Sequence, residues 1–209
     1  MFIFDLDGTL IDSRQDIVFA VNLARESYDL PLLPFEFVIK AIGNGAATLI
    51  CRCFENTDVA PEEALKRYKE AYAAHLLDNT RLYDGVAESL AFLRERNIPM
   101  AVVTNKPEKA TRTILDGLGI LDYFSIVIGG GSGFVLKPAP DALLHCLEVS
   151  GEEAGTSWMI GDHYTDLESG RRAGMKRGFA RWGFGETRGE DFDADLLSPD
   201  RITGLAVER

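Results

Sequence analysis

The sequence predicts an α/β protein: a doubly wound parallel sheet with an inserted, smaller α-helical domain. Two observations carry this prediction. From about residue 82 onward, short apolar segments that resemble buried strands alternate with amphipathic helical segments, which is typical of βαβ units. One more strand is expected at residues 2–4, and the 13–80 region that follows it shows helical patterns and no convincing strand. The helical region therefore interrupts the α/β order as an insertion.

The first strand, Phe2-Ile3-Phe4, is an unbroken apolar run that is too short for a helix, as expected for a strand buried on both faces. A helix follows from Ser13, which with Asp16 resembles a capping box. Prolines end this helix, and the Gly43-Asn44-Gly45 sequence indicates a sharp turn. We expect three more helices in the insertion. A short one ends near residue 41, a second spans residues 46–54, and a third spans about residues 61–77.

The second region begins with a helix whose Val86, Leu90 and Leu93 face inward. Its strands are expected at residues 99–104, 125–128, 157–160, 177–180 and 194–197, and its other helices at 107–118, 140–149 and up to about 173. We therefore expect an α/β core made of residues 1–12 and 82–209 and an inserted small helical domain made of residues 13–81.

Composition narrows the possible functions. The 209 residues are 46% hydrophobic, enough for one ordinary core and a small accessory domain. A net charge of -11 would repel a phosphate backbone, so we expect no nucleic-acid partner. Three cysteines are an odd count that favours neither a disulfide framework nor a Cys-based zinc site. With no signal-peptide pattern and no membrane-length apolar run, the expected location is the cytoplasm.

Two carboxylates follow the first strand, at Asp5 and Asp7. Residues two apart in an extended segment point the same way, so these side chains could converge beyond the strand end. Like charges at this spacing repel unless a cation or a proton lies between them. The pair therefore suggests metal binding or catalysis, although an N-cap aspartate and a turn aspartate before a glycine would have the same pattern.

Polar residues also end the later strands. Thr104 and Asn105 follow the second strand, Lys137 lies in the loop after the third, and Asp162 ends the fourth. Ligands of an open parallel sheet bind beyond the carboxyl ends of its strands, where the strand order reverses. We therefore expect acids, a hydroxyl group and an ammonium group to gather at one edge of the sheet.

These segments resemble, in order, the four motifs of the haloacid dehalogenase-like (HAD) hydrolases. The motifs here are Asp5-Leu6-Asp7-Gly8-Thr9-Leu10, Thr104-Asn105, Lys137-Pro138 and Gly161-Asp162-His163-Tyr164-Thr165-Asp166. The resemblance covers nearly the whole chain and implies a Rossmann-like core, with a cap inserted between the first and second motifs. Gly43-Asn44-Gly45 and Leu82-Tyr83-Asp84-Gly85-Val86 are more similar to phosphoglycolate phosphatases than to other members.

The resemblance also implies a role for each motif residue. Asp5 would attack phosphorus to form an aspartyl phosphate, and Asp7 would act as general acid and base. Asp5, the backbone carbonyl of Asp7 and Asp162 would bind Mg²⁺, which prefers oxygen ligands. The phosphoryl group would be bound by Thr104, Lys137 and backbone amides near Gly8 and Asn105, and Asp166 would orient Lys137 or a water molecule of the metal site.

The expected substrate is a small phosphorylated metabolite such as 2-phosphoglycolate, with Asn44 and Arg52 as candidate cap contacts. An acid at Asp7 favours a phosphatase over a dehalogenase, because a halide leaves without a proton. A β-phosphoglucomutase-like phosphosugar mutase, a pyrophosphatase and a nucleotidase remain open, and so does a non-enzymatic phospho-receiver domain. We expect His163 to line the site at most, since Mg²⁺ disfavours imidazole. A monomer and a homodimer are both compatible with the sequence, and no membrane partner is expected.

Overall fold

A computed structural model describes residues 1–207 of the chain. Within these residues, six strands form one parallel sheet in the order β5-β4-β1-β6-β7-β8. Its central strand β1 pairs with β4 on one side and β6 on the other, so the strand order reverses there. The strands are β1 (Phe2–Phe4), β4 (Met100–Pro107), β5 (Ile126–Gly130), β6 (Trp158–Gly161), β7 (Lys176–Ala180) and β8 (Ala194–Leu196). The predicted doubly wound sheet is confirmed.

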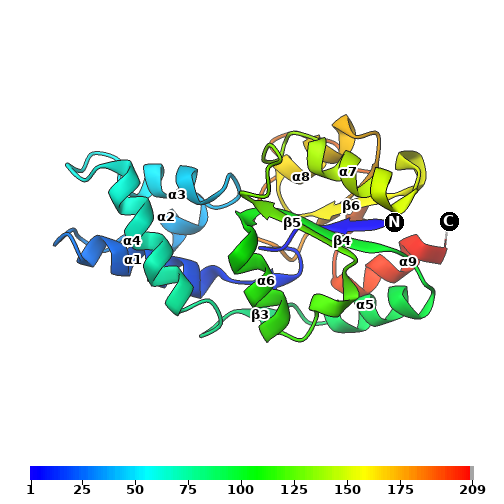
Figure 1. Ribbon diagram of the computed structural model, residues 1–209, viewed down its shortest axis with the longest axis horizontal. Coiled ribbons are helices and arrows are strands. Elements are labelled where there is room, and N and C mark those ends of the chain that lie inside the picture. The colour runs from blue at the N-terminus through cyan, green and yellow to red at the C-terminus, as the bar shows by residue number, and fades with distance from the viewer. Residues whose placement is uncertain (208–209) are drawn as a thin grey trace.

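Helices cover both faces of the sheet, with α7 and α8 on one face and α5, α6 and α9 on the other (Figure 1). Alternating side chains of β1 serve the two layers, since Phe2 and Phe4 belong to one hydrophobic cluster and Ile3 to the other. The helices are α5 (Val86–Glu95), α6 (Glu108–Gly117), α7 (Asp141–Ser150), α8 (Tyr164–Arg172) and α9 (Ile202–Val207), with 3-10 turns at Leu121–Tyr123, Ala154–Thr156 and Pro199–Arg201. None of the helices within residues 1–207 is long and apolar enough to span a bilayer.

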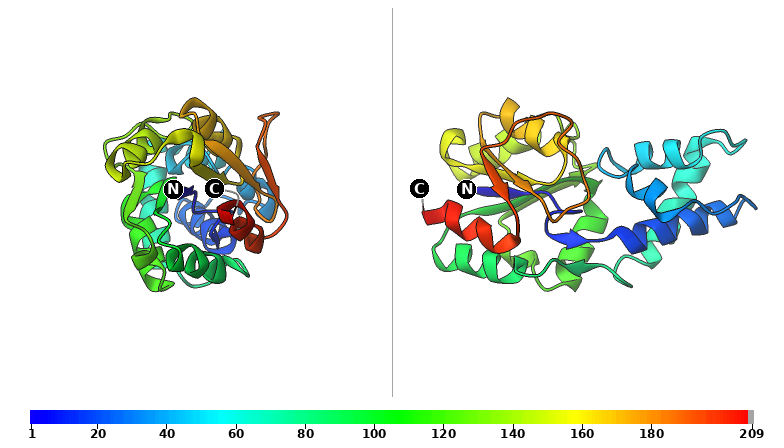
Figure 2. Two further views of the ribbon diagram at one scale, coloured as in Figure 1. Left: turned by 90° about the vertical axis from the view of Figure 1, so that its right-hand side faces the viewer. Right: turned by 180° about the vertical axis from the view of Figure 1, so that it is seen from behind.

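The inserted region lies beside the core at one end of the molecule (Figures 1 and 2). It contains α1 (Arg14–Glu26), α2 (Phe35–Ile39), α3 (Ala46–Cys53) and α4 (Pro61–Ala74), with α4 packed against α1 and α3. Both connections to the core run through a small antiparallel sheet of β2 (Ile11–Asp12) and β3 (Arg81–Leu82). We propose that this sheet marks the boundary between a cap of residues 13–81 and a core of residues 1–12 and 82–209.

The predicted capping box at the start of α1 is wrong, because both of its side chains bond elsewhere. The Ser13 hydroxyl donates to Asp7 at 2.5 Å. The buried Asp16 carboxylate accepts hydrogen bonds from the backbone N–H groups of Asn79 and Thr80 and from the Thr80 hydroxyl, at 2.7 to 2.9 Å. Asp16 therefore joins the first cap helix to the segment through which the chain returns to the core.

Candidate active site

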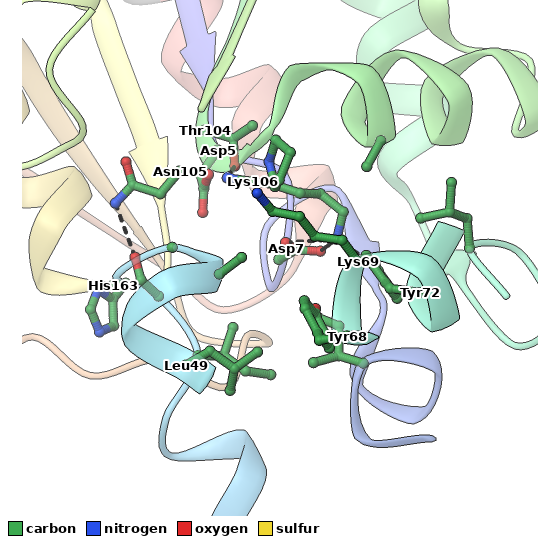
Figure 3. A pocket seen from close by; sticks show the side chains of 18 of the residues that line it. Asp5, Asp7, Leu49, Tyr68, Lys69, Tyr72, Thr104, Asn105, Lys106 and His163 are labelled. Carbon is green, nitrogen blue, oxygen red and sulfur yellow. Dashed lines mark hydrogen bonds and ion pairs between the residues drawn. The ribbon is translucent and has the colours of Figure 1, made fainter. Parts of the chain in front are cut away.

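A cavity of about 510 Å³ lies between the cap and the carboxyl edge of the sheet. The core contributes the polar wall and the cap contributes most of the apolar wall (Figure 3). Of the residues predicted from sequence, Asp5, Asp7, Thr104, Asn105, Lys137 and Asp162 line this cavity. His163 lines it too, together with the cap residues Ile17, Ile42, Gly43, Leu49, Tyr68, Tyr72 and Leu76.

Lys137 is fixed by three acceptors at the inner end of the cavity. Its Nζ lies 2.8 Å from Asp5 Oδ1, 2.7 Å from Asp166 Oδ1 and 2.6 Å from the carbonyl oxygen of Val103. Burial by itself disfavours the ammonium form, but Asp166 and Asp5 outweigh it and raise the pKa of Lys137. These contacts favour the charged ammonium form of Lys137 beside Asp5.

Three buried carboxylates gather at the same place. Oxygen atoms of Asp5, Asp162 and Asp166 lie within 4.8 Å of one another. Burial raises the pKa of Asp5 to about 6 and holds the pKa of Asp162 well above its usual value. Asp162 Oδ2 accepts backbone N–H groups of Phe184 and Gly185 at 2.9 and 2.8 Å, which leaves Oδ1 without such a bond in the described chain.

This donor set fits Mg²⁺. All three candidate ligands are carboxylate oxygens, and Lys137 alone cannot balance three buried negative charges. Repulsion between the aspartates adds to burial in raising the pKa values of Asp5 and Asp162, and a divalent cation would offset that repulsion. The loop after β1 passes very close to Asp162. Gly8 in this loop has φ +85°, and a Cβ added to it would lie 2.1 Å from Asp162 Oδ2. Only glycine lets the chain pass this close to Asp162.

Asp7 faces a different cation. Its two carboxylate oxygens lie 2.8 and 3.0 Å from Lys106 Nζ, and it also accepts the Ser13 hydroxyl. Each of the two carboxylates therefore has its own lysine partner: Asp5 pairs with Lys137 and Asp7 with Lys106. Sequence reasoning missed Lys106, although a signal was present: it lies two residues after Thr104 in an extended segment and so points to the same side.

Asn105 connects the cap to the loop of Lys137. Its side-chain Oδ1 accepts the Lys137 N–H at 2.8 Å, and its Nδ2 donates to the Lys137 carbonyl at 2.9 Å and to the carbonyl of Gly43 in the cap at 3.1 Å. Thr104 is buried at the same strand end, and its hydroxyl oxygen accepts the N–H of Lys106 at 3.3 Å. Phosphate binding by Thr104 and Asn105 stays a prediction.

The remaining predicted residues do not line the cavity. Gly8 donates its N–H to Ile11 within its own turn at 2.9 Å. In the cap, Asn44 Oδ1 accepts the hydroxyl of Tyr164 at 2.7 Å, and Arg52 lies 3.5 Å from the carbonyl of Ala41. The Gly8 N–H, Asn44 Oδ1 and Arg52 therefore have protein partners, whereas the buried Asn44 Nδ2 has no hydrogen-bond partner within the described residues.

His163 is the N-cap residue of α8 and packs against the cap turn. The backbone N–H of His163 donates to Asp166 Oδ2 at 3.0 Å, and a Cβ added to Gly43 would lie 2.7 Å from the His163 imidazole ring. Burial lowers the pKa of His163 to about 4, so the ring is neutral near neutral pH. It acts as a surface for the cap and adds no charge to the cluster.

The comparisons with known proteins agree with this geometry. Residues 2–180 match the family described as "Haloacid dehalogenase-like hydrolase". A phosphoglycolate phosphatase of Aquifex aeolicus is 33% identical over 98% of this chain and 95% of that protein, and one of Haemophilus influenzae is 36% identical over 82% and 80%. The crystal structure of a predicted phosphoglycolate phosphatase from Haemophilus somnus superimposes with a TM-score of 0.94 at 27% identity, covering 100% of this chain and 97% of that one. The chain therefore belongs to the haloacid dehalogenase-like hydrolases.

Proposed function

We propose that the protein is a Mg²⁺-dependent phosphomonoesterase that works through an aspartyl phosphate on Asp5. The observation that carries this proposal is the position of the Asp5 carboxylate, which lies 2.8 Å from Lys137 Nζ and within 4.8 Å of an Asp162 oxygen, in a cavity that Asp7 also lines. A nucleophile, a fixed cation and a second carboxylate for proton transfer are the groups that a two-step phosphoryl transfer needs.

In the first step, an Asp5 oxygen attacks phosphorus while the bond from phosphorus to the ester oxygen breaks, and Asp7 gives a proton to the departing oxygen. In the second step, water attacks the same phosphorus atom, Asp7 takes a proton from it, and phosphate leaves as Asp5 is regenerated. Lys137 balances charge on the phosphoryl oxygens in both steps, and the Thr104 hydroxyl donates to one of them. The cap excludes bulk water from the cavity.

Mg²⁺ would be held by the carboxylates of Asp5 and Asp162 and by the backbone carbonyl of Asp7. It would supply positive charge for the phosphoryl oxygens. Asp166 lies close enough to belong to the same ligand set, but its Oδ1 is paired with Lys137. We propose that Asp166 holds Lys137 in position.

Among the candidate substrates we favour a small, anionic phosphomonoester such as 2-phosphoglycolate. Relatives named phosphoglycolate phosphatase span most of the chain. The cap side of the cavity presents mainly apolar side chains, with Ile17, Leu49 and Leu76 buried there. Such walls leave the hydroxyl groups of a sugar or nucleoside without hydrogen-bond partners, which costs free energy. The phosphosugar mutase and nucleotidase readings are thus less well supported, and family membership argues against a phospho-receiver domain.

The decisive test measures phosphate release from p-nitrophenyl phosphate with Mg²⁺, with EDTA, and after Mg²⁺ is restored. We expect EDTA to abolish turnover reversibly and Asp5→Asn to remove it. Turnover without a divalent cation, or full activity of Asp5→Asn, would contradict the mechanism.

A panel of 2-phosphoglycolate, glucose 1-phosphate, pyrophosphate and a nucleoside monophosphate then distinguishes the candidate activities, since a mutase returns an isomeric sugar phosphate. Cytoplasmic location and oligomeric state stay predictions.

A further inference from the structure

Lys106 is a buried cation whose role the two-step chemistry leaves open. Its side chain is 3% exposed, and its Nζ donates to both oxygens of Asp7 and, at 2.5 Å, to the hydroxyl of Tyr72 in the cap (Figure 3). The Tyr72 ring also lies against it, with the Nζ atom 4.6 Å from the ring centroid. An ammonium group held between the core and the cap at the wall of a cavity is well placed to meet a ligand.

The other cations of the cavity are less suitable for recognising a substrate beside Asp7. Within the described residues, four lysines line it: Lys69, Lys106, Lys109 and Lys137. Lys137 is already saturated by Asp5, Asp166 and a backbone carbonyl. Lys69 and Lys109 are exposed, so solvent screens their charge. Lys106 is thus the buried cation nearest to the group that would protonate the departing oxygen.

Size alone cannot make this cavity selective for a short substrate. Its volume of about 510 Å³ exceeds that of a two-carbon phosphate ester, and its cap walls offer mainly shape and apolar surface. A second negative charge on the substrate would be costly to bury there without a partner. Selection for such a substrate must therefore come from a buried positive charge.

We propose that Lys106 is the specificity residue of this enzyme and binds a carboxylate of the substrate. This inference rests on the proposed phosphomonoesterase function and assigns its substrates to phosphate esters of short 2-hydroxy acids. In such an ester the carboxylate is separated by one carbon from the ester oxygen that Asp7 protonates. A cation 2.8 Å from Asp7 is consequently within reach of it.

On binding, the ammonium group would turn from one oxygen of Asp7 to the substrate carboxylate while its bond to Tyr72 holds it in place. No covalent bond changes in this exchange. Tyr72 is then a positioning residue: as part of α4 it orients Lys106 only when the cap is placed as it is here. The cap would thereby contribute to specificity through a core lysine.

The test compares two substrates that differ in the carboxylate and share a poor, primary-alcohol leaving group: 2-phosphoglycolate and 2-hydroxyethyl phosphate. We expect the wild-type protein with Mg²⁺ to prefer 2-phosphoglycolate in kcat/KM. Lys106→Met should reduce that preference by roughly 10- to 100-fold, the usual worth of a hydrogen bond to a charged group. Most of the change should appear in KM for 2-phosphoglycolate. Tyr72→Phe should reduce the preference less, and the exposed Lys66→Met serves as the matched control.

The ratio of kcat/KM for 2-phosphoglycolate to kcat/KM for 2-hydroxyethyl phosphate distinguishes recognition of the carboxylate from an indirect effect of Lys106 on Asp7. If Lys106→Met lowers kcat/KM for both substrates by the same factor, the lysine acts only through Asp7 and the proposal is overturned. It is also overturned if the preference is lost in Lys69→Met or Lys109→Met instead, or if the wild-type protein hydrolyses both substrates equally well. The comparison of the two substrates with the wild-type protein tests the proposal even if a variant fails to fold. Failure to release phosphate from either substrate or from p-nitrophenyl phosphate would instead reject the proposed function.

Discussion

Asn105 in the core and Gly43 in the cap are joined by a hydrogen bond of 3.1 Å between the side-chain amide and the backbone carbonyl. The same amide group donates to the carbonyl of Lys137, whose N–H it also accepts through Oδ1. One side chain is therefore bonded both to the cap turn and to the loop that carries Lys137. Cap placement and lysine placement are coupled through it.

We expect Asn105→Ala to lower kcat/KM at least tenfold and to destabilise the protein by about 2 kcal/mol, because buried backbone groups of Lys137 lose their partners. Urea unfolding and phosphate release measure the two effects. Asn22→Ala is the matched control, since Asn22 makes the same pair of bonds with the backbone of Leu33 inside the cap. An equal loss of activity in both variants would show that the effect of Asn105 is only one of stability.

Gly43→Ala should reduce activity by disturbing the contact between the cap turn and His163. Gly43 has φ +114°, where side chains are strained, and its added Cβ would lie 2.7 Å from the imidazole ring. The expected outcome is a higher KM, measured in the same phosphate-release assay. Gly151→Ala provides the control, because Gly151 also has a positive φ, +68°, but no atom lies within 4 Å of its added Cβ. Gly151→Ala should lose stability and keep its KM.

Asp16→Asn should destabilise the folded protein by about 2 to 3 kcal/mol at neutral pH, since the carboxylate accepts several hydrogen bonds from Asn79 and Thr80. The exposed Glu26→Gln on the same helix should have almost no effect. Thermal and urea unfolding provide the measurement.

The effect of Asp16→Asn should also depend on pH. Burial opposes ionisation of Asp16, but the hydrogen bonds from Asn79 and Thr80 together outweigh it and lower the pKa of this carboxyl below the ordinary aspartate value of 3.8. Its contribution is therefore complete above 3.8 and is lost as the pH falls through the lower pKa of the folded state. The gap between wild type and variant should be constant from neutral pH down to about pH 4 and shrink below that. A gap that widens in acid would contradict this assignment.

Asp162→Asn and Asp166→Asn should affect different steps. Removing the charge of Asp162 should raise the Mg²⁺ concentration for half-maximal activity by roughly 10- to 100-fold. Asp166→Asn should mainly lower kcat, because Asp166 is 2.7 Å from Lys137 and holds its ammonium group. Phosphate release measured against Mg²⁺ concentration distinguishes them. Equal shifts in the Mg²⁺ requirement would identify Asp166 as a metal ligand.

Much of the core could be predicted from the sequence, because its signals are local. Phe2-Ile3-Phe4 forms a central strand, and the predicted helix with Val86, Leu90 and Leu93 inward is present as α5 with those residues buried. Parallel strands share one carboxyl edge, so polar residues at strand ends must gather there. The sequence therefore predicts that Asp5, Thr104, Lys137 and Asp162 gather at one edge, and all four line the same cavity. The two-residue strands β2 and β3 were missed, since a pattern of two residues carries no periodicity.

The α/β fold, the inserted helical region and the chemical groups at the edge of the sheet all follow from local sequence pattern. Which groups meet is known only from the folded chain: Lys106 pairs with Asp7, 99 residues away in sequence, Lys137 pairs with Asp166, and Asn44 bonds to Tyr164 outside the cavity lining. The physical reason is that strand-end chemistry follows from local pattern, whereas these pairings depend on side-chain direction and on where the cap sits against the core. Neither is encoded in the spacing of residues along the chain.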